Sequence, residues 1–141
     1  MRKSYLLYTG LGLSILLWVL NSLALERSLY WSLGWYDVMM HFLAGFVLGL
    51  AGYWLLFKSG LFFSSFYKPA FMIFVVFVAV FILGVAWEVF EIIFYNFIAQ
   101  NPFDILDTIS DVCFDLAGGA FALLYFFIHI MLISKNEVQL P

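Results

Sequence analysis

Carboxylates and one imidazole recur at helical spacing in three apolar segments of this 141-residue chain. Steps of three or four residues place side chains on the same face of a helix. The set comprises Asp37 and His41 in the first segment, Glu88 and Glu91 in the second, and Asp107, Asp111 and Asp115 in the third. Carboxylates grouped with an imidazole are the donors of a divalent metal site or of general acid–base chemistry.

The chain around these residues has the composition of a polytopic membrane protein. Hydrophobic residues make up 66% of it and charged residues 11%, and the mean hydropathy is +1.07. A bilayer core of about 30 Å needs about 20 apolar residues per helix, and four segments meet this requirement: residues 5–25, 37–57, 69–98 and 107–133. The sequence therefore predicts an all-α integral membrane protein, a single domain over residues 1–141, whose four helices form an antiparallel up-down bundle.

The basic residues predict how this bundle is oriented. Five of the six would lie at one membrane face and only Arg27 at the other; the five are Arg2, Lys3, Lys58, Lys68 and Lys135. By the positive-inside rule both termini are cytoplasmic, which predicts a multi-pass protein of the bacterial inner membrane. The N-terminal segment ending in Ser22-Leu23-Ala24 also resembles a cleaved signal peptide, but its apolar run is long enough to favour an uncleaved anchor.

This topology places the ionisable residues of all three segments at similar depth, about 5–15 Å below the extracytoplasmic surface. Glycines continue the same helix faces towards the middle of the membrane: Gly45, Gly49, Gly84 and Gly118. Because small residues let helices approach closely in lipid, we expect a bundle that is tightly packed below a polar pocket. Asp37 and Asp107 also fit helix N-cap positions, so a purely structural role is an alternative for each.

No lysine or arginine lies within these stretches to pair with the acids. Buried like charges cannot all stay ionised and unpaired, so a metal ion, shared protons or a cationic ligand must neutralise them. An oxygen-rich set with one histidine suits Mg, Mn, Ca or Fe better than Zn. The predicted metal ligands come from His41, Glu88, Asp107, Asp111 and Asp115; Glu91 or Asp37 is predicted to orient a ligand or to act as general base.

The same residues, in this order, resemble the VanZ-like and YjdF-like families of small bacterial membrane proteins over about residues 36–120. The resemblance is carried by Asp37-Val38-Met39-Met40-His41-Phe42 with Gly45-Phe46, by Trp87-Glu88-Val89-Phe90-Glu91, and by Asp107-Thr108, Asp111, Asp115 and Gly118. Val38 replaces a lysine frequent in these families, and the VanZ-like arginine before the last helix is absent, so the YjdF-like pattern is closer. Glu91 and Asp115 stand where VanZ-like chains often carry Gln and Asn.

The resemblance implies a compact helical bundle with a polar site. VanZ-like members are associated with tolerance of glycopeptide antibiotics. Neither family has an established biochemical activity that the resemblance could imply for this chain. Because the VanZ-like arginine is absent, this chain cannot use it to bind a phosphate or carboxylate group.

Three functions are consistent with these patterns. The leading one is a metal-dependent hydrolase or transferase that acts on a lipid-linked or cell-envelope substrate at the outer leaflet. The second is a non-enzymatic binder or carrier with a proton-sharing or cationic-ligand site, which in so small a chain would require a homo-oligomer. The third is an accessory subunit. A net charge of -3 without a basic tract argues against nucleic acid as a partner.

Overall fold

The computed structural model describes residues 2–60, 68–94 and 104–138 of the chain, and this part is built from helices. In chain order they are α1 (Arg2–Arg27), the short α2 (Leu29–Ser32), α3 (Tyr36–Tyr53), the π-helical turn η1 (Trp54–Lys58), α4 (Pro69–Phe94) and α5 (Ile105–Val138). Within the described residues, four helical segments are long and apolar enough to cross a membrane: Leu7–Arg27, Tyr36–Lys58, Pro69–Phe94 and Ile105–Ile128.

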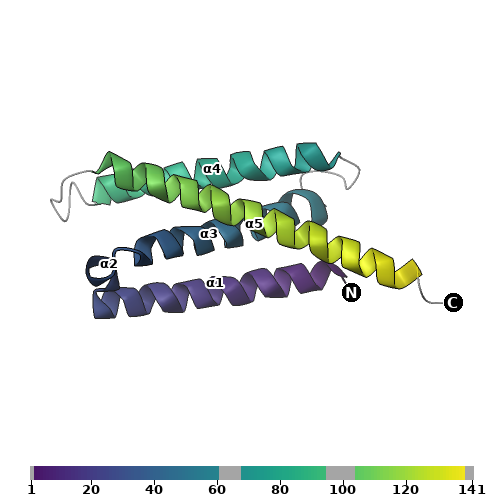
Figure 1. The fold of residues 1–141 in the computed structure, drawn as a ribbon, viewed down its shortest axis with the longest axis horizontal. Coiled ribbons are helices and arrows are strands. Elements are labelled where there is room, and N and C mark those ends of the chain that lie inside the picture. The colour runs from purple at the N-terminus through teal and green to yellow at the C-terminus, as the bar shows by residue number, and fades with distance from the viewer. Residues whose placement is uncertain (1, 61–67, 95–103, 139–141) are drawn as a thin grey trace.

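The four long helices run alternately up and down, as the sequence predicts (Figure 1). α1 begins and α5 ends at the same end of the bundle. At the opposite end, which we call the acidic end, α3 and α5 begin and α4 reaches Phe94. The second predicted span is completed by η1, and α2 was not predicted. Residues 95–98, the expected end of the third span, lie outside the described residues.

Two helices begin earlier than the candidate N-caps Asp37 and Asp107. α3 starts at Tyr36 after Trp35, which makes no side-chain cap, so Asp37 lies in the first turn. At α5 the cap is Asp104, whose Oδ1 accepts a hydrogen bond from the backbone N–H of Leu106 at 2.9 Å. The N-cap interpretation of Asp37 and Asp107 is therefore wrong, because an earlier residue occupies each cap position.

The closest helix contact in the bundle is between α3 and α5, which pack against each other more extensively than any other pair. Two glycines on opposite helices permit it. A Cβ atom on Gly45 would lie 2.6 Å from the Cα of Asp115, and a Cβ on Gly118 would lie 2.6 Å from the backbone nitrogen of Phe46. Neither position has room for a side chain, as the glycine stripes predict.

Beyond these glycines, towards the end where the chain begins, α3, α4 and α5 enclose a hydrophobic core. Its buried members are Leu50, Tyr53, Phe57, Val76, Val80, Ala122, Leu123 and Phe126. α1 packs chiefly on α3. Their contact centres on Ala24, Tyr36 and Met40, and the Tyr36 hydroxyl donates a hydrogen bond to the carbonyl of Leu20 at 3.0 Å. α1 is therefore a flank of a three-helix core.

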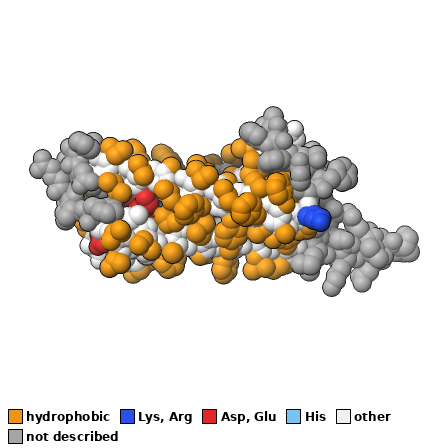
Figure 2. Space-filling model, turned by 90° about the horizontal axis from the view of Figure 1, so that it is seen from above, with side chains coloured by type: hydrophobic (Ala, Val, Ile, Leu, Met, Phe, Trp, Pro, Cys, Tyr) orange, Lys and Arg blue, Asp and Glu red, His pale blue; other side chains and the backbone are white. Residues whose placement is uncertain are grey.

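The outer surface of the bundle is hydrophobic along most of its length, as a helix surface facing lipid must be. Figure 2 shows one such face, on which acidic side chains appear near one end and basic side chains near the other. The uncharged band between them fits the four membrane-spanning segments. The space-filling view and the sequence thus agree on a multi-pass membrane protein.

Replacing Gly45 with alanine should destabilise the fold, because the new methyl group would overlap the backbone of α5. We expect the free energy of unfolding to fall by about 1–3 kcal/mol, the usual cost of overpacking a tight contact. Thermal or denaturant unfolding in detergent measures this change. Gly12→Ala on α1 is the matched control, since a Cβ there would meet no atom within 4 Å. Equal stability of the two variants would contradict the packing described here.

Candidate functional site

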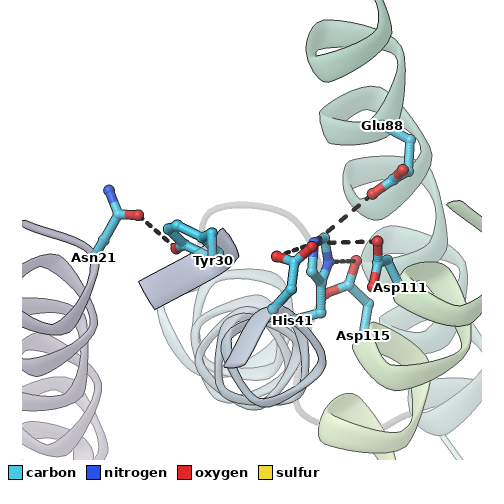
Figure 3. Close-up of polar contacts among 7 residues, drawn as sticks. Asn21, Tyr30, His41, Glu88, Asp111 and Asp115 are labelled. Carbon is cyan, nitrogen blue, oxygen red and sulfur yellow. Dashed lines mark hydrogen bonds and ion pairs between the residues drawn. The ribbon is translucent and has the colours of Figure 1, made fainter. Parts of the chain in front are cut away.

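The imidazole of His41 lies at the centre of a group of carboxylates at the acidic end of the bundle (Figure 3). It is only 5% exposed, and the neighbouring Glu88, Asp111 and Asp115 are 4%, 1% and 3% exposed. His41 comes from α3, Glu88 from α4, and both aspartates from α5. We call these four residues, together with the half-buried Asp37 and Glu91, the acidic cluster.

The two nitrogens of His41 face different acids. Nε2 lies 3.8 Å from Oδ1 of Asp37, 3.9 Å from Oε1 of Glu88 and 3.8 Å from Oδ2 of Asp111. Three helix positions thus surround one nitrogen at nearly equal distances. Nε2 is thus the atom around which these three carboxylate oxygens gather.

Asp115 stands on the other side of the ring, with its Oδ2 at 3.4 Å from Nδ1 of His41. A carboxylate in this position fixes the orientation of an imidazole and leaves Nε2 available to a ligand. Gly84 makes room for it, because a Cβ on Gly84 would lie 2.7 Å from the same Oδ2. The glycine of α4 is therefore part of the site, a role that its place in a small-residue stripe did not reveal.

Two carboxylate oxygens of the cluster are buried without a hydrogen-bond donor. Oε1 of Glu88 and Oδ1 of Asp111 accept no hydrogen bond from any described residue. A buried oxygen without a donor is costly, and more so when the group is charged. The described part of the chain offers these oxygens no donor, so a bound ligand or a shared proton is needed to satisfy them.

Two overlapping sets of donor atoms are close enough to hold one ion. Asp37, His41 and Asp111 form the first, and His41, Glu88 and Glu91 form the second; within each set the donor atoms lie within 4.8 Å of one another. Asp37 and Glu91 are the less buried members. The cluster is thus enclosed by Glu88 and Asp111 and opens beside Asp37 and Glu91.

Six of the seven predicted site residues belong to this cluster. The exception is Asp107, which is exposed in the first turn of α5 and forms no ion pair with His41 among the described contacts. The polar residues of α1 also stay apart from it. Ser14 donates its hydroxyl to the carbonyl of Gly10, and Asn21 accepts a hydrogen bond from the Tyr30 hydroxyl at 2.7 Å (Figure 3).

Removing one carboxylate from the metal-free cluster should stabilise the protein. Unit charges about 4 Å apart repel by at least about 1 kcal/mol even in water, and by more when partly buried. We therefore expect Asp111→Asn, measured in a chelating buffer, to raise the free energy of unfolding by about 1 kcal/mol or more. Asp107→Asn, at an exposed position of the same helix, should raise it less, because solvent screens the repulsion of an exposed charge. A large loss of stability in Asp111→Asn would show that this carboxylate is a structural partner.

Comparison with known proteins identifies the family and nothing further. No curated protein and no solved structure matches the chain. The family described as "Predicted membrane protein (DUF2238)" matches residues 1–131, nearly the whole chain. The match covers all four candidate spans and every residue of the acidic cluster. The chain therefore belongs to the DUF2238 family of predicted membrane proteins.

Proposed function

We propose that the acidic cluster binds a divalent metal ion at Nε2 of His41, and that the protein is a metal-dependent hydrolase or transferase of a lipid-linked or cell-envelope substrate. One observation carries the proposal: carboxylate oxygens from three helix positions surround a single imidazole nitrogen at 3.8–3.9 Å. Two oxygens of this cluster are buried without a donor, and no described lysine or arginine forms an ion pair with it. A cation satisfies all of these groups at once.

The donor set suits a hard divalent ion. Carboxylates with one imidazole are typical ligands of Mn, Mg, Ca or Fe, whereas zinc favours more nitrogen and sulfur. Bonds of about 2.1–2.4 Å place neighbouring ligand atoms about 3–3.4 Å apart. Nε2 and each of the three oxygens around it, at 3.8–3.9 Å, would therefore have to close by less than about 1 Å. Glu88 and Asp111 are the proposed inner ligands beside His41. Asp115 would orient the imidazole from Nδ1, and Asp107 would add negative charge at the rim.

The bound ion would supply a polarised water or phosphoryl oxygen, which is the chemistry needed to cleave or transfer a phosphoester. Asp37 and Glu91 would then act on the substrate and on the attacking water. They lie at the less buried side of the cluster, where a substrate arrives, and each has a carboxylate that can accept a proton from an attacking water. These two residues are the proposed general base and orienting group.

The proposed location is the extracytoplasmic half of the bacterial inner membrane. The distribution of basic residues supports it, because Lys58 and Lys68 lie at the end opposite the acidic cluster. A site buried between helices at this depth would reach lipid headgroups more readily than soluble substrates.

A non-enzymatic cation or proton binder is the second candidate. It is favoured by the four carboxylates around His41, because a protonated imidazole can itself neutralise part of their charge. Metal analysis separates the two functions, since a proton-sharing site holds no stoichiometric metal.

The test is elemental analysis of detergent-purified protein after loading with Mn, Mg, Ca, Fe or Zn. We expect about one metal ion per chain in the wild type and a loss of most of it in Glu88→Gln and His41→Ala, because each change removes an inner ligand. His129→Ala is the control, since the proposal gives His129 no role. Metal-loaded wild-type protein should then release phosphate from a diacylglycerol phosphate or a prenyl phosphate.

Two results would overturn the proposal. Absence of metal from the wild type under every loading condition would refute the metal site and favour proton sharing. Full metal content in Glu88→Gln, with the variant folded by circular dichroism, would refute the assignment of Glu88 as a ligand.

A further inference from the structure

A groove of about 380 Å³ runs along the bundle between α1 and α4, with α3 as its floor. It is lined from α1 by Leu7, Gly10, Leu11 and Ser14, from α3 and η1 by Leu48, Ala51, Gly52, Trp54 and Leu55, and from α4 by Ala79 and Leu83. The lining is apolar apart from Ser14, whose hydroxyl is already bonded to the carbonyl of Gly10. The groove therefore offers an occupant hydrocarbon contacts and no hydrogen bond from this side chain.

Small residues create this groove. α1 packs chiefly on α3 rather than on α4, which leaves the two helices apart. A Cβ on Gly10 would meet no atom within 4 Å, and one on Gly52 would meet only Val76, at 4.0 Å. Gly10 on α1 and Gly52 on α3 leave this space between the larger lining side chains. The lining from Leu48 to Leu55 spans eight residues, or about 10 Å of helix.

The lining faces of α3, the floor of the groove, and of α4, one of its walls, continue along each helix towards the acidic cluster. Along η1 and α3, Leu55, Ala51, Leu48, Ala44 and Asp37 follow one another at steps of three, four or seven, which keeps them on one strip. The lining strip of α3 therefore ends at Asp37. Ala44, between the groove and this acid, has a small and partly exposed side chain.

On α4, Ala79, Leu83, Trp87 and Glu91 follow one another at steps of four, so this face turns by about 120° around the helix before it reaches Glu91. Asp37 and Glu91 are the half-buried members of the cluster, whereas Glu88, Asp111 and Asp115 are almost completely buried. The faces of α3 and α4 thus both end at the side on which the cluster is open.

We infer that this groove holds one hydrocarbon chain of a lipid whose phosphate-bearing headgroup lies at the acidic cluster. The inference rests on the proposed function, because the cluster would repel a phosphate unless a bound cation neutralised it. It deepens that function by naming the substrate class: a membrane lipid with a phosphate next to its chain, which enters sideways from the bilayer between α1 and α4. A water-soluble phosphoester would leave the groove unused.

The inference can be tested by photolabelling in nanodiscs of phosphatidylcholine that contain Mn²⁺ and a small fraction of phosphatidylglycerol with a diazirine in one acyl chain. Labelled positions are mapped by peptide mass spectrometry. We expect groove positions such as Leu11, Leu48 and Leu83 to be labelled several-fold more than Trp18 and Phe74, which are exposed outside the groove. Replacing Mn²⁺ with a chelator should remove most of this preference.

Ala51→Trp fills the groove and should lower its labelling to the level of the outer surface. Leu124→Trp places the same side chain at an exposed position of α5, which does not line the groove, and should leave the labelling unchanged. Circular dichroism and thermal unfolding verify that both variants fold. Equal labelling of groove and outer positions in the wild type would overturn the inference, as would groove labelling that Ala51→Trp does not reduce.

The Mn²⁺ content of the same nanodiscs, measured by electron paramagnetic resonance, separates this inference from the proposed function. Bound Mn²⁺ without preferential labelling of the groove would support the metal site but refute the binding of a lipid chain in the groove. A groove preference that the chelator does not alter overturns the placement of the phosphate at the cluster. Absence of bound Mn²⁺, together with absence of every other ion from the loaded protein, overturns the proposed function.

Discussion

The close backbone contact between α3 and α5 is the constraint on which the site depends. At Gly45 and Gly118 the two helices approach until no side chain fits between them. His41 precedes Gly45 by one turn, and Asp111 and Asp115 precede Gly118 by one or two turns. The contact therefore fixes the separation between the imidazole and two of its carboxylates. In lipid, where apolar burial does not drive helices together, such small-residue packing is a principal source of association.

α4 completes the site, and again a glycine makes the close approach possible. Gly84 lets the carboxylate of Asp115 occupy space that a side chain would take, and Glu88, one turn further along α4, approaches Nε2 of His41. This arrangement lowers the stability of the fold, because the buried acids repel one another and two of their oxygens have no hydrogen-bond donor. A fold seldom retains such a cost unless a ligand offsets it, which is why the acidic cluster is the best candidate for function in this protein.

Much of this architecture could be predicted from the sequence because membrane helices obey simple rules of length and periodicity. The four spans, their alternation and the gathering of His41, Glu88, Asp111 and Asp115 follow from apolar length and steps of three or four residues. The caps could not be placed as well, because Asp37, Asp104 and Asp107 are all acceptable at a helix start and only the local backbone decides between them. The separation between α1 and α4 could not be predicted from the sequence either. It depends on which helix faces pack together, and the spacing of apolar residues within each span does not determine this.

The central claim is that Nε2 of His41 on α3 binds a divalent cation together with the carboxylates of Glu88 on α4 and Asp111 on α5. The most direct measurement is pulsed electron paramagnetic resonance of the Mn²⁺-loaded protein, which detects a nitrogen nucleus bonded to the metal. The account predicts coupling to one imidazole nitrogen in the wild type and its disappearance in His41→Ala. Bound Mn²⁺ without nitrogen coupling in the wild type, or coupling that persists in His41→Ala, would contradict it.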